Sequence, residues 1–93
     1  MDKKCLKNVF GLRNRKISAY GDPIVTVASK EQMAKDLSRY CVIEPQEAKK
    51  AHYDESELFL IGTYDDEQGK IIPLQENEFI CSFDNLFITN TKA

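Results

Sequence analysis

Residues 57–74 read ELFLIGTYDDEQGKIIPL, and this stretch predicts a β-hairpin. Its first part, Leu58–Tyr64, is rich in aromatic and branched apolar residues, as strands are. The polar run Asp65–Gly69 then predicts a turn, in which Gly69 can supply the positive φ that closes a four- or five-residue loop. Lys70–Leu74 follows as the returning strand.

Short apolar runs outside the hairpin predict further strands. They are rich in β-branched and aromatic residues, and polar breaks at Arg13–Lys16 and Gly21–Pro23 separate the first three. The runs are Asn8–Leu12, Ile17–Tyr20, Ile24–Val27, Phe79–Phe83 and Leu86–Thr89. The second run can instead remain a loop, and the last two predict one final strand.

The main helix is predicted over residues 29–42. Ser29 suits the N-cap because its hydroxyl can accept a backbone N–H of the first turn, while Gln32 can reach back to complete a capping box. An apolar stripe follows at helical spacing, formed by Met33, Leu37, Tyr40 and Cys41. Pro45 suits the first position of a further short helix over Gln46–Ala51.

Together these elements predict a small α+β fold in a single domain spanning residues 1–93. The tight connections favour a small antiparallel sheet of about four to five strands, covered on one face by one main helix. A composition of 42% hydrophobic and 30% charged residues is typical of a globular chain that buries one modest core. We expect residues 1–7 to form a flexible basic N-terminus.

The chemistry-bearing residues match no catalytic or metal-binding motif. Cys5, Cys41 and Cys81 are far apart and His52 is the only histidine, so neither zinc spacing nor a nucleophile–base pair is present. The acidic turn lacks the ligand spacing of a calcium loop, and the four glycines are too scattered for a phosphate loop. We therefore expect reduced cysteines, no enzyme activity, no metal and no cofactor.

Charge is sorted along the chain. Residues 1–50 hold eleven Lys or Arg and six Asp or Glu, whereas residues 51–93 hold two and nine, although the net charge is only −2. Such asymmetry indicates an electrostatic partner. Cations interleaved with aromatic rings are typical of single-stranded DNA binding, because cations neutralise phosphates and rings stack on bases. The predicted nucleic-acid-binding residues are Lys7, Arg13, Arg15, Lys16, Tyr20 and Arg39.

Other functions stay open at this point. The isoelectric point near 5.4 is unlike the basic footprint of most nucleic-acid-binding proteins. An interaction module would bind a partner protein through the acidic hairpin, and an acidic inhibitor would imitate the charge of DNA with residues 54–67. No apolar stretch approaches the roughly 20 residues that span a bilayer, and no secretory signal is evident, so we expect a cytoplasmic protein.

The segment His52–Ile71, HYDESELFLIGTYDDEQGKI, resembles the small nonstructural protein of gokushovirus-like microviruses, which are single-stranded DNA phages. The shared features are an aromatic–aspartate pair at Tyr53-Asp54, a strand ending in Ile-Gly, a second pair at Tyr64-Asp65 and an acidic turn closed by Gly69. The order of the upstream elements is also similar, so the resemblance covers roughly residues 8–74.

This resemblance implies a phage-encoded, non-virion protein that works in the bacterial cytoplasm. It implies DNA binding that assists genome replication or packaging, with no catalytic residues and no cofactor. We expect binding to single-stranded DNA without sequence preference, because one short domain then acts along the whole polyanion. The acidic half would face away from the DNA or contact a basic neighbour of the same protein, giving self-association along the strand.

Overall fold

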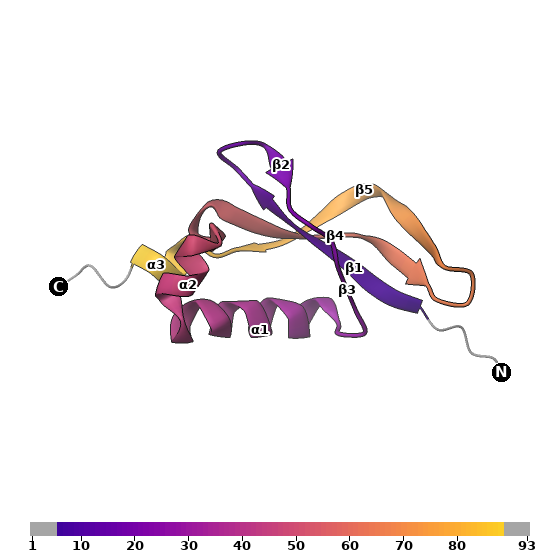
Figure 1. Ribbon diagram of the computed structural model, residues 1–93, viewed down its shortest axis with the longest axis horizontal. Helices are drawn as coiled ribbons and strands as arrows, with labels where there is room; N and C mark the ends of the chain where they lie inside the picture. Colours follow the sequence, from indigo (N-terminus) through magenta and orange to yellow (C-terminus); the bar gives the residue numbers. More distant parts are fainter. Residues whose placement is uncertain (1–5, 89–93) are drawn as a thin grey trace.

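The computed structural model describes residues 6–88, in which a curled antiparallel sheet lies over one long helix (Figure 1). The elements in chain order are β1 (Leu6–Asn14), β2 (Ala19–Tyr20), β3 (Ile24–Thr26), α1 (Lys30–Ile43), α2 (Pro45–Lys50), the 3-10 turn η1 (Tyr53–Glu55), β4 (Ser56–Asp65), β5 (Lys70–Ser82) and α3 (Asn85–Ile88). The sheet order is β2-β1-β4-β5, and β3 also pairs with β1. The predicted α+β class, with a small antiparallel sheet and one main helix, is confirmed.

The sheet is assembled around β1. One edge of β1 pairs with β4 along its whole length, from Leu6 opposite Asp65 to Asn14 opposite Ser56. The other edge is shared by β3 at one end and β2 at the other. Because β1 comes from the basic half of the sequence and β4 from the acidic half, this antiparallel pairing brings the two kinds of charge side by side.

The core lies between the sheet and α1. Its buried members are Phe10, Met33, Cys41, Ala48, Leu58 and Phe83. The predicted helical stripe is confirmed, since Met33 and Cys41 are buried while Leu37 and Tyr40 pack against the cluster. Full burial of each large apolar side chain stabilises the fold by about 1.5–3 kcal/mol. Desolvation raises the pKa of the Cys41 thiol to about 11, so this thiol is protonated at neutral pH.

The N-terminus of α1 is capped as the sequence predicts, but only half of the capping box forms. The Ser29 hydroxyl accepts the backbone N–H of Gln32 at 3.1 Å. The Gln32 side chain does not reach back as predicted; it donates to Asp36 at 2.7 Å instead. Pro45 opens the short helix α2, which confirms the second helical prediction. None of the helices within residues 6–88 has the length and apolarity needed to cross a membrane.

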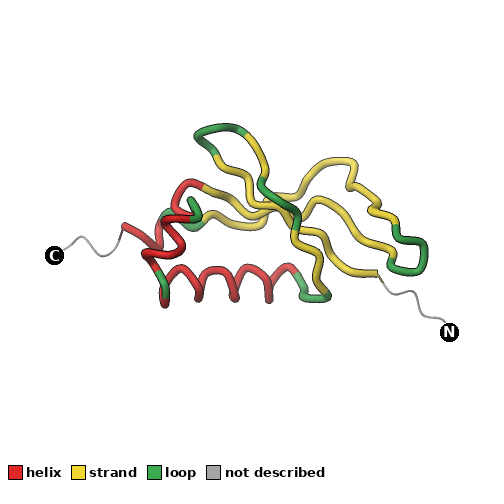
Figure 2. The backbone as a smooth tube through the Cα atoms, viewed as in Figure 1, coloured by secondary structure: helices red, strands yellow, loops and turns green. Residues whose placement is uncertain are grey.

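The predicted hairpin is present as β4 and β5, and its turn projects beyond the helices at one end of the molecule (Figure 2). Gly69 has the expected positive φ, at +65°. The Asp65 carboxylate accepts the backbone N–H groups of Glu67 at 3.0 Å and Gln68 at 3.3 Å, which fixes the start of the turn. Within β4, Gly62 allows close approach, because a Cβ there would lie 2.6 Å from the Ile72 carbonyl oxygen.

The strand β5 differs from the prediction because it unites two predicted strands. Gly62 pairs with Pro73 and Leu60 pairs with Glu78, so residues 74–77 bulge out of the ladder between these pairs. This bulge carries the polar run Gln75, Glu76 and Asn77, which lies between two predicted strands. A bulge of this kind bends and twists the strand locally.

Three other local predictions need correction. The strand predicted over Leu86–Thr89 is wrong, since α3 occupies Asn85–Ile88; the Asp84 carboxylate accepts the Asn85 N–H at 3.1 Å and so favours a helical turn. Thr89 itself lies outside the described residues. The break predicted at Arg13–Lys16 begins later, because β1 continues to Asn14. Of the segment 1–7 expected to be flexible, Leu6 and Lys7 instead open β1, and residues 1–5 lie outside the described part.

Candidate nucleic-acid interface

Three of the predicted cations contact carboxylates of the acidic half. The ion pairs are Lys7–Asp66 at 3.6 Å, Arg15–Glu57 at 3.9 Å, Arg15–Asp84 at 3.8 Å and Lys16–Glu55 at 3.5 Å. They follow from the pairing of β1 with β4 and from the turn that continues β1. Each pair is partly exposed and therefore contributes only about 0–1 kcal/mol to stability. Their main consequence is local neutrality, because charges that are separated along the sequence meet in space.

Arg15 is held in place by more than its ion pairs. Its guanidinium donates a hydrogen bond to the Asp54 carbonyl oxygen at 3.3 Å, and its backbone N–H donates to the Glu55 carbonyl oxygen at 2.9 Å. The turn after β1 is thereby attached to η1. Asn14 fixes the same turn, since its side-chain oxygen accepts the Lys16 N–H at 2.9 Å. Arg15 therefore stabilises the contact between this turn and η1, and it is also a candidate for DNA contact.

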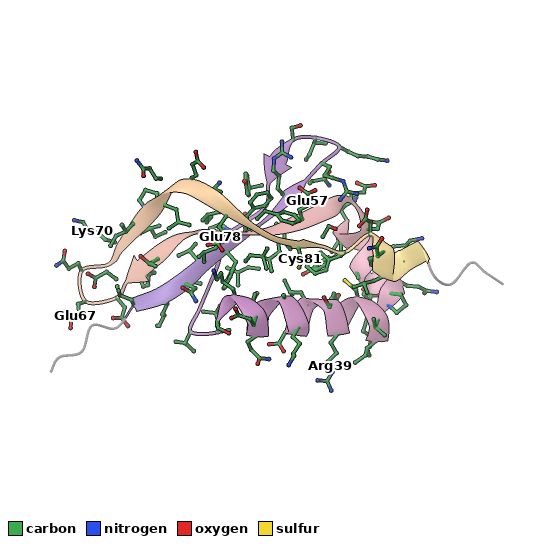
Figure 3. All side chains as sticks on the ribbon, turned by 180° about the vertical axis from the view of Figure 1, so that it is seen from behind. Arg39, Glu57, Glu67, Lys70, Glu78 and Cys81 are labelled. Atoms are coloured by element: carbon green, nitrogen blue, oxygen red, sulfur yellow. The ribbon has the colours of Figure 1, made fainter. Side chains whose placement is uncertain are left out.

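The remaining two predicted cations differ in position. Arg13 is the direct cross-strand neighbour of Tyr20, so their side chains share one face of the sheet. Arg39 is exposed and points away from the sheet on the outer side of α1 (Figure 3). Neither arginine forms an ion pair with another described residue. The structure therefore brings Arg13 together with Tyr20 and places Arg39 on another surface.

A row of three aromatic rings occupies the sheet face that α1 does not cover. The row consists of Tyr20 from β2, Phe59 from β4 and Phe79 from β5. Tyr20 and Phe59 have ring centroids 5.7 Å apart and Phe59 and Phe79 5.6 Å apart, both edge-to-face. Tyr20 is 39% exposed and Phe79 is 54% exposed. We call these three residues the aromatic row.

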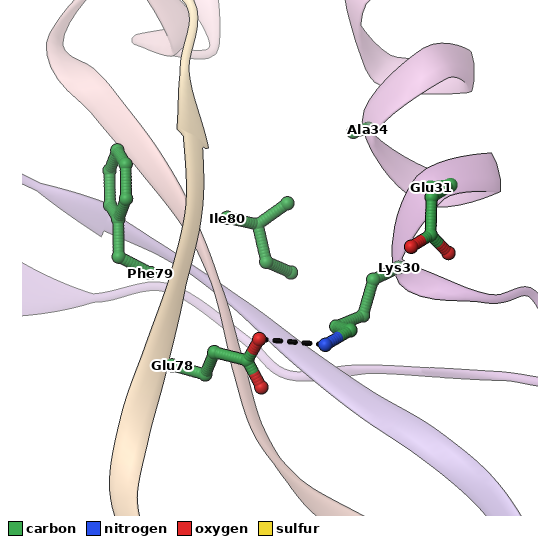
Figure 4. A pocket seen from close by; sticks show the side chains of 6 residues that line it. All are labelled: Lys30, Glu31, Ala34, Glu78, Phe79 and Ile80. Atoms are coloured by element: carbon green, nitrogen blue, oxygen red, sulfur yellow. Dashed lines mark hydrogen bonds and ion pairs between the residues drawn. The ribbon is translucent and has the colours of Figure 1, made fainter.

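Strand alternation explains why the aromatic row faces away from the helix. Leu58 is fully buried in the core, and successive side chains of a strand point to opposite faces, so Phe59 points outward. Phe79 is its direct partner on β5. The close view shows Phe79 on one side of β5 and Ile80 on the other, toward α1 (Figure 4).

Gly11 leaves space for the Tyr20 ring because it has no side chain. A Cβ at Gly11 would lie 3.0 Å from Tyr20 Cδ2 and 3.5 Å from Ile61 Cδ1. The Tyr20 ring therefore lies over β1 and reaches Phe59 on the next strand. Its hydroxyl accepts a hydrogen bond from Asn77 Nδ2 at 3.0 Å, so β2 is also linked to β5.

Of these residues, Tyr20 is predicted from the sequence, whereas Phe59, Phe79 and Asn77 are not. The alternation of Leu58 with Phe59 in a predicted strand already indicated that Phe59 would lie on the outer face. Phe79 and Asn77 carried no such signal, because their position depends on the bulge in β5.

Two concave regions lie on the described surface, one lined in part by Phe79 and the other in part by Tyr20. One, of about 310 Å³, lies between the start of α1 and β5. At its mouth Lys30 Nζ contacts Glu78 at 2.7 Å, and this hydrogen bond raises the pKa of Lys30 (Figure 4). The other, of about 260 Å³, lies between the β1–β2 turn and the loop that leads into η1. Within residues 6–88, His, Cys, Asp and Glu side chains form no group of three suited to a metal ion; the absence of a metal stays a prediction.

Comparison with known protein families finds a match to the phage ORF5 protein family over residues 7–86. The chain belongs to the phage ORF5 protein family. No curated protein and no solved structure matches the chain.

The family match covers the sheet, α1, α2 and the whole aromatic row. It confirms the predicted phage protein, while the narrower assignment to gokushovirus-like microviruses stays a prediction.

Proposed function

We propose that this phage ORF5 family protein binds single-stranded DNA without sequence preference and so assists genome replication or packaging in the bacterial cytoplasm. It would act as a binding protein, without enzyme activity, metal or cofactor. The aromatic row is the observation that supports the proposal. Two of its three rings are well exposed, they lie on an uncovered sheet face, and Arg13 is beside them.

Stacking explains both the strand preference and the lack of sequence preference. Every unpaired base has a π-face that can stack on Tyr20 or Phe79, whereas the bases of a duplex are already stacked on one another. Arginine beside such rings adds a phosphate contact or a cation–π contact. Because three predicted cations already contact carboxylates, stacking is expected to contribute more than charge neutralisation.

The test is fluorescence anisotropy of labelled single-stranded oligonucleotides of several sequences. Phe79→Ala is expected to weaken binding by about 1–3 kcal/mol on every sequence, because one stacking ring is lost. Val42→Ala is the control, since Val42 is 62% exposed on α1, away from the aromatic row. The proposal fails if the wild-type protein at micromolar concentration and low salt does not bind. If the Phe79→Ala variant binds with wild-type affinity, the aromatic row has no part in DNA binding.

One observation favours a protein partner instead. Ile71 and Ile72, at the start of β5, are 53% and 47% exposed close to the acidic hairpin turn. An apolar pair beside acids suits an interaction module that binds a replication or packaging protein of the host or phage. In that case Ile71→Ser with Ile72→Ser would abolish function in the infected cell, while Phe79→Ala would leave it intact. Self-association along DNA stays a prediction, tested by sedimentation with and without oligonucleotide.

A further inference from the structure

A single hydrogen bond joins the two outer strands of the sheet across the aromatic row. In the order β2-β1-β4-β5, β2 and β5 lie at opposite edges. Asn77 Nδ2 nevertheless donates to Tyr20 Oη at 3.0 Å, between residues 57 positions apart in sequence. The bond is possible because the sheet curls and because Gly11 lets the Tyr20 ring lie over β1.

Both partners of this bond come from segments with few other restraints. β2 is only two residues long, and both Ala19 and Tyr20 are exposed. Asn77 ends the four-residue bulge of β5, where ladder pairing with β4 is interrupted. The described contacts that fix the Tyr20 side chain are the edge-to-face contact with Phe59, the approach to Gly11 and the bond to Asn77.

We infer that Asn77 is a positioning residue for single-stranded DNA binding: it holds the Tyr20 ring in the aromatic row before a base arrives. This inference rests on the proposed function. A ring that is already ordered loses less rotational freedom on binding, so the complex is tighter than with a mobile ring. The bond does not close the surface, because Tyr20 remains 39% exposed and Phe79 54% exposed while it is formed.

The chain offers a variant that removes the bond and keeps the ring. Tyr20→Phe deletes only the hydroxyl, and Asn77→Ala deletes the donor. Each is expected to weaken binding to single-stranded DNA about two- to tenfold, the range that follows from losing one hydrogen bond. The double variant is expected to bind no more weakly than either single variant, because both act through the same bond. Gln75→Ala is the control, from the same exposed bulge but with no hydrogen bond to a described side chain.

Two further readouts separate positioning from a general structural role. The slope of log affinity against log salt should stay at its wild-type value in all three variants, because no charge is removed. Thermal unfolding followed by circular dichroism checks that each variant is folded under the binding conditions. Substituting Tyr20 by Ala should weaken binding more than Tyr20→Phe, since the ring is then lost as well.

Several outcomes would overturn the inference. Additive losses in the double variant would show that Asn77 acts independently of Tyr20. Tighter binding by Tyr20→Phe would show that the bond obstructs the surface. Unchanged affinity in both single variants, with Phe79→Ala still impaired, would refute the role of Asn77 and leave the proposed function standing. Absence of binding by the wild-type protein would refute the proposed function and this inference with it.

Discussion

Removing the carboxylates that neutralise Arg15 and Lys16 is expected to strengthen DNA binding. The change is Glu55→Gln combined with Glu57→Gln. Glu55 lies 3.5 Å from Lys16 Nζ, and Glu57 lies 3.9 Å from Arg15 Nη1. Glutamine keeps an oxygen that can accept the Asn14 side-chain hydrogen bond now made to Glu55 at 3.4 Å, so the turn after β1 retains its local contact.

The size of the effect follows from the two released cations. Each cation that gains a phosphate steepens the slope of log affinity against log salt by about 0.7 on single strands. Lys16, whose side chain is 73% exposed, is released fully, but Arg15 still has Asp84 at 3.8 Å. The expected steepening is therefore about 0.7 to 1.4. Exposed pairs of this kind contribute about 0.2–1 kcal/mol each, so affinity at low salt should rise by about two- to thirtyfold in total.

The assay is anisotropy of one oligonucleotide at four or more salt concentrations. The matched control is Glu31→Gln combined with Glu67→Gln, which changes the net charge equally at two exposed positions without an ion pair to a described residue. If the control variant gained as much affinity and slope as the test variant, overall charge would explain the effect. The two paired carboxylates would then have no specific effect on DNA binding.

Three further predictions concern stability and the core. Gly62→Ala should lower the free energy of unfolding, measured in urea, by about 1–3 kcal/mol, because the added Cβ would lie 2.6 Å from the Ile72 carbonyl oxygen. An unchanged free energy of unfolding would show that β4 and β5 can move apart at little cost. Gly69→Val should cost about 1 kcal/mol or more by the same measurement, because φ is +65° there, and wild-type stability would contradict the strain. With Cys5 and Cys81 replaced by Ser, Cys41 is the one remaining thiol. At about pH 8 it should react with a thiol reagent far more slowly in the folded protein than in urea, since burial raises its pKa to about 11; equal rates would show that the thiol is accessible.

Local signals in the sequence were sufficient for the elements that depend on near neighbours. The Ser29 cap, the Met33 to Cys41 stripe, Pro45 at the start of α2 and Gly69 in the hairpin turn each depend on contacts within a few residues. The helix α3 was missed because its apolar residues resemble a strand, although the Leu86 and Phe87 N–H groups donate to the carbonyl oxygens of Phe83 and Asp84 and so form a helical turn.

The continuity of β5 depends on its long-range register with β4, which no local pattern encodes. Without that register, residues 74–77 read as a polar loop between two strands, although they form a bulge within one. The positions of Phe79 and Asn77 follow from the same register. For this reason no signal in the sequence indicated Phe79, whereas the alternation within β4 did indicate the position of Phe59.

The charge pattern could be interpreted fully only with the topology. Cations of residues 1–50 and acids of residues 51–93 suggested an external polyanion, but the pairing of β1 with β4 supplies much of the opposite charge internally. Among the predicted cations beside the aromatic row, Arg13 is the one that makes no ion pair with a described residue. Each phosphate contact contributes about −0.7 to the slope of log affinity against log salt, so the wild-type protein should bind single-stranded DNA with weak salt dependence.

If the protein binds DNA as proposed, the neutralised cations and the exposed rings would together favour unpaired over duplex DNA. A duplex presents phosphates at high density, so a basic surface without neighbouring carboxylates attracts it strongly. A duplex offers no free base face for stacking. Here the carboxylates weaken that attraction, while the aromatic row remains available only to unpaired bases. The double change of Glu55 and Glu57 to Gln should accordingly raise affinity for duplex DNA by a larger factor than for single strands. If the ratio of the two affinities stayed constant, the carboxylates would have no part in strand discrimination.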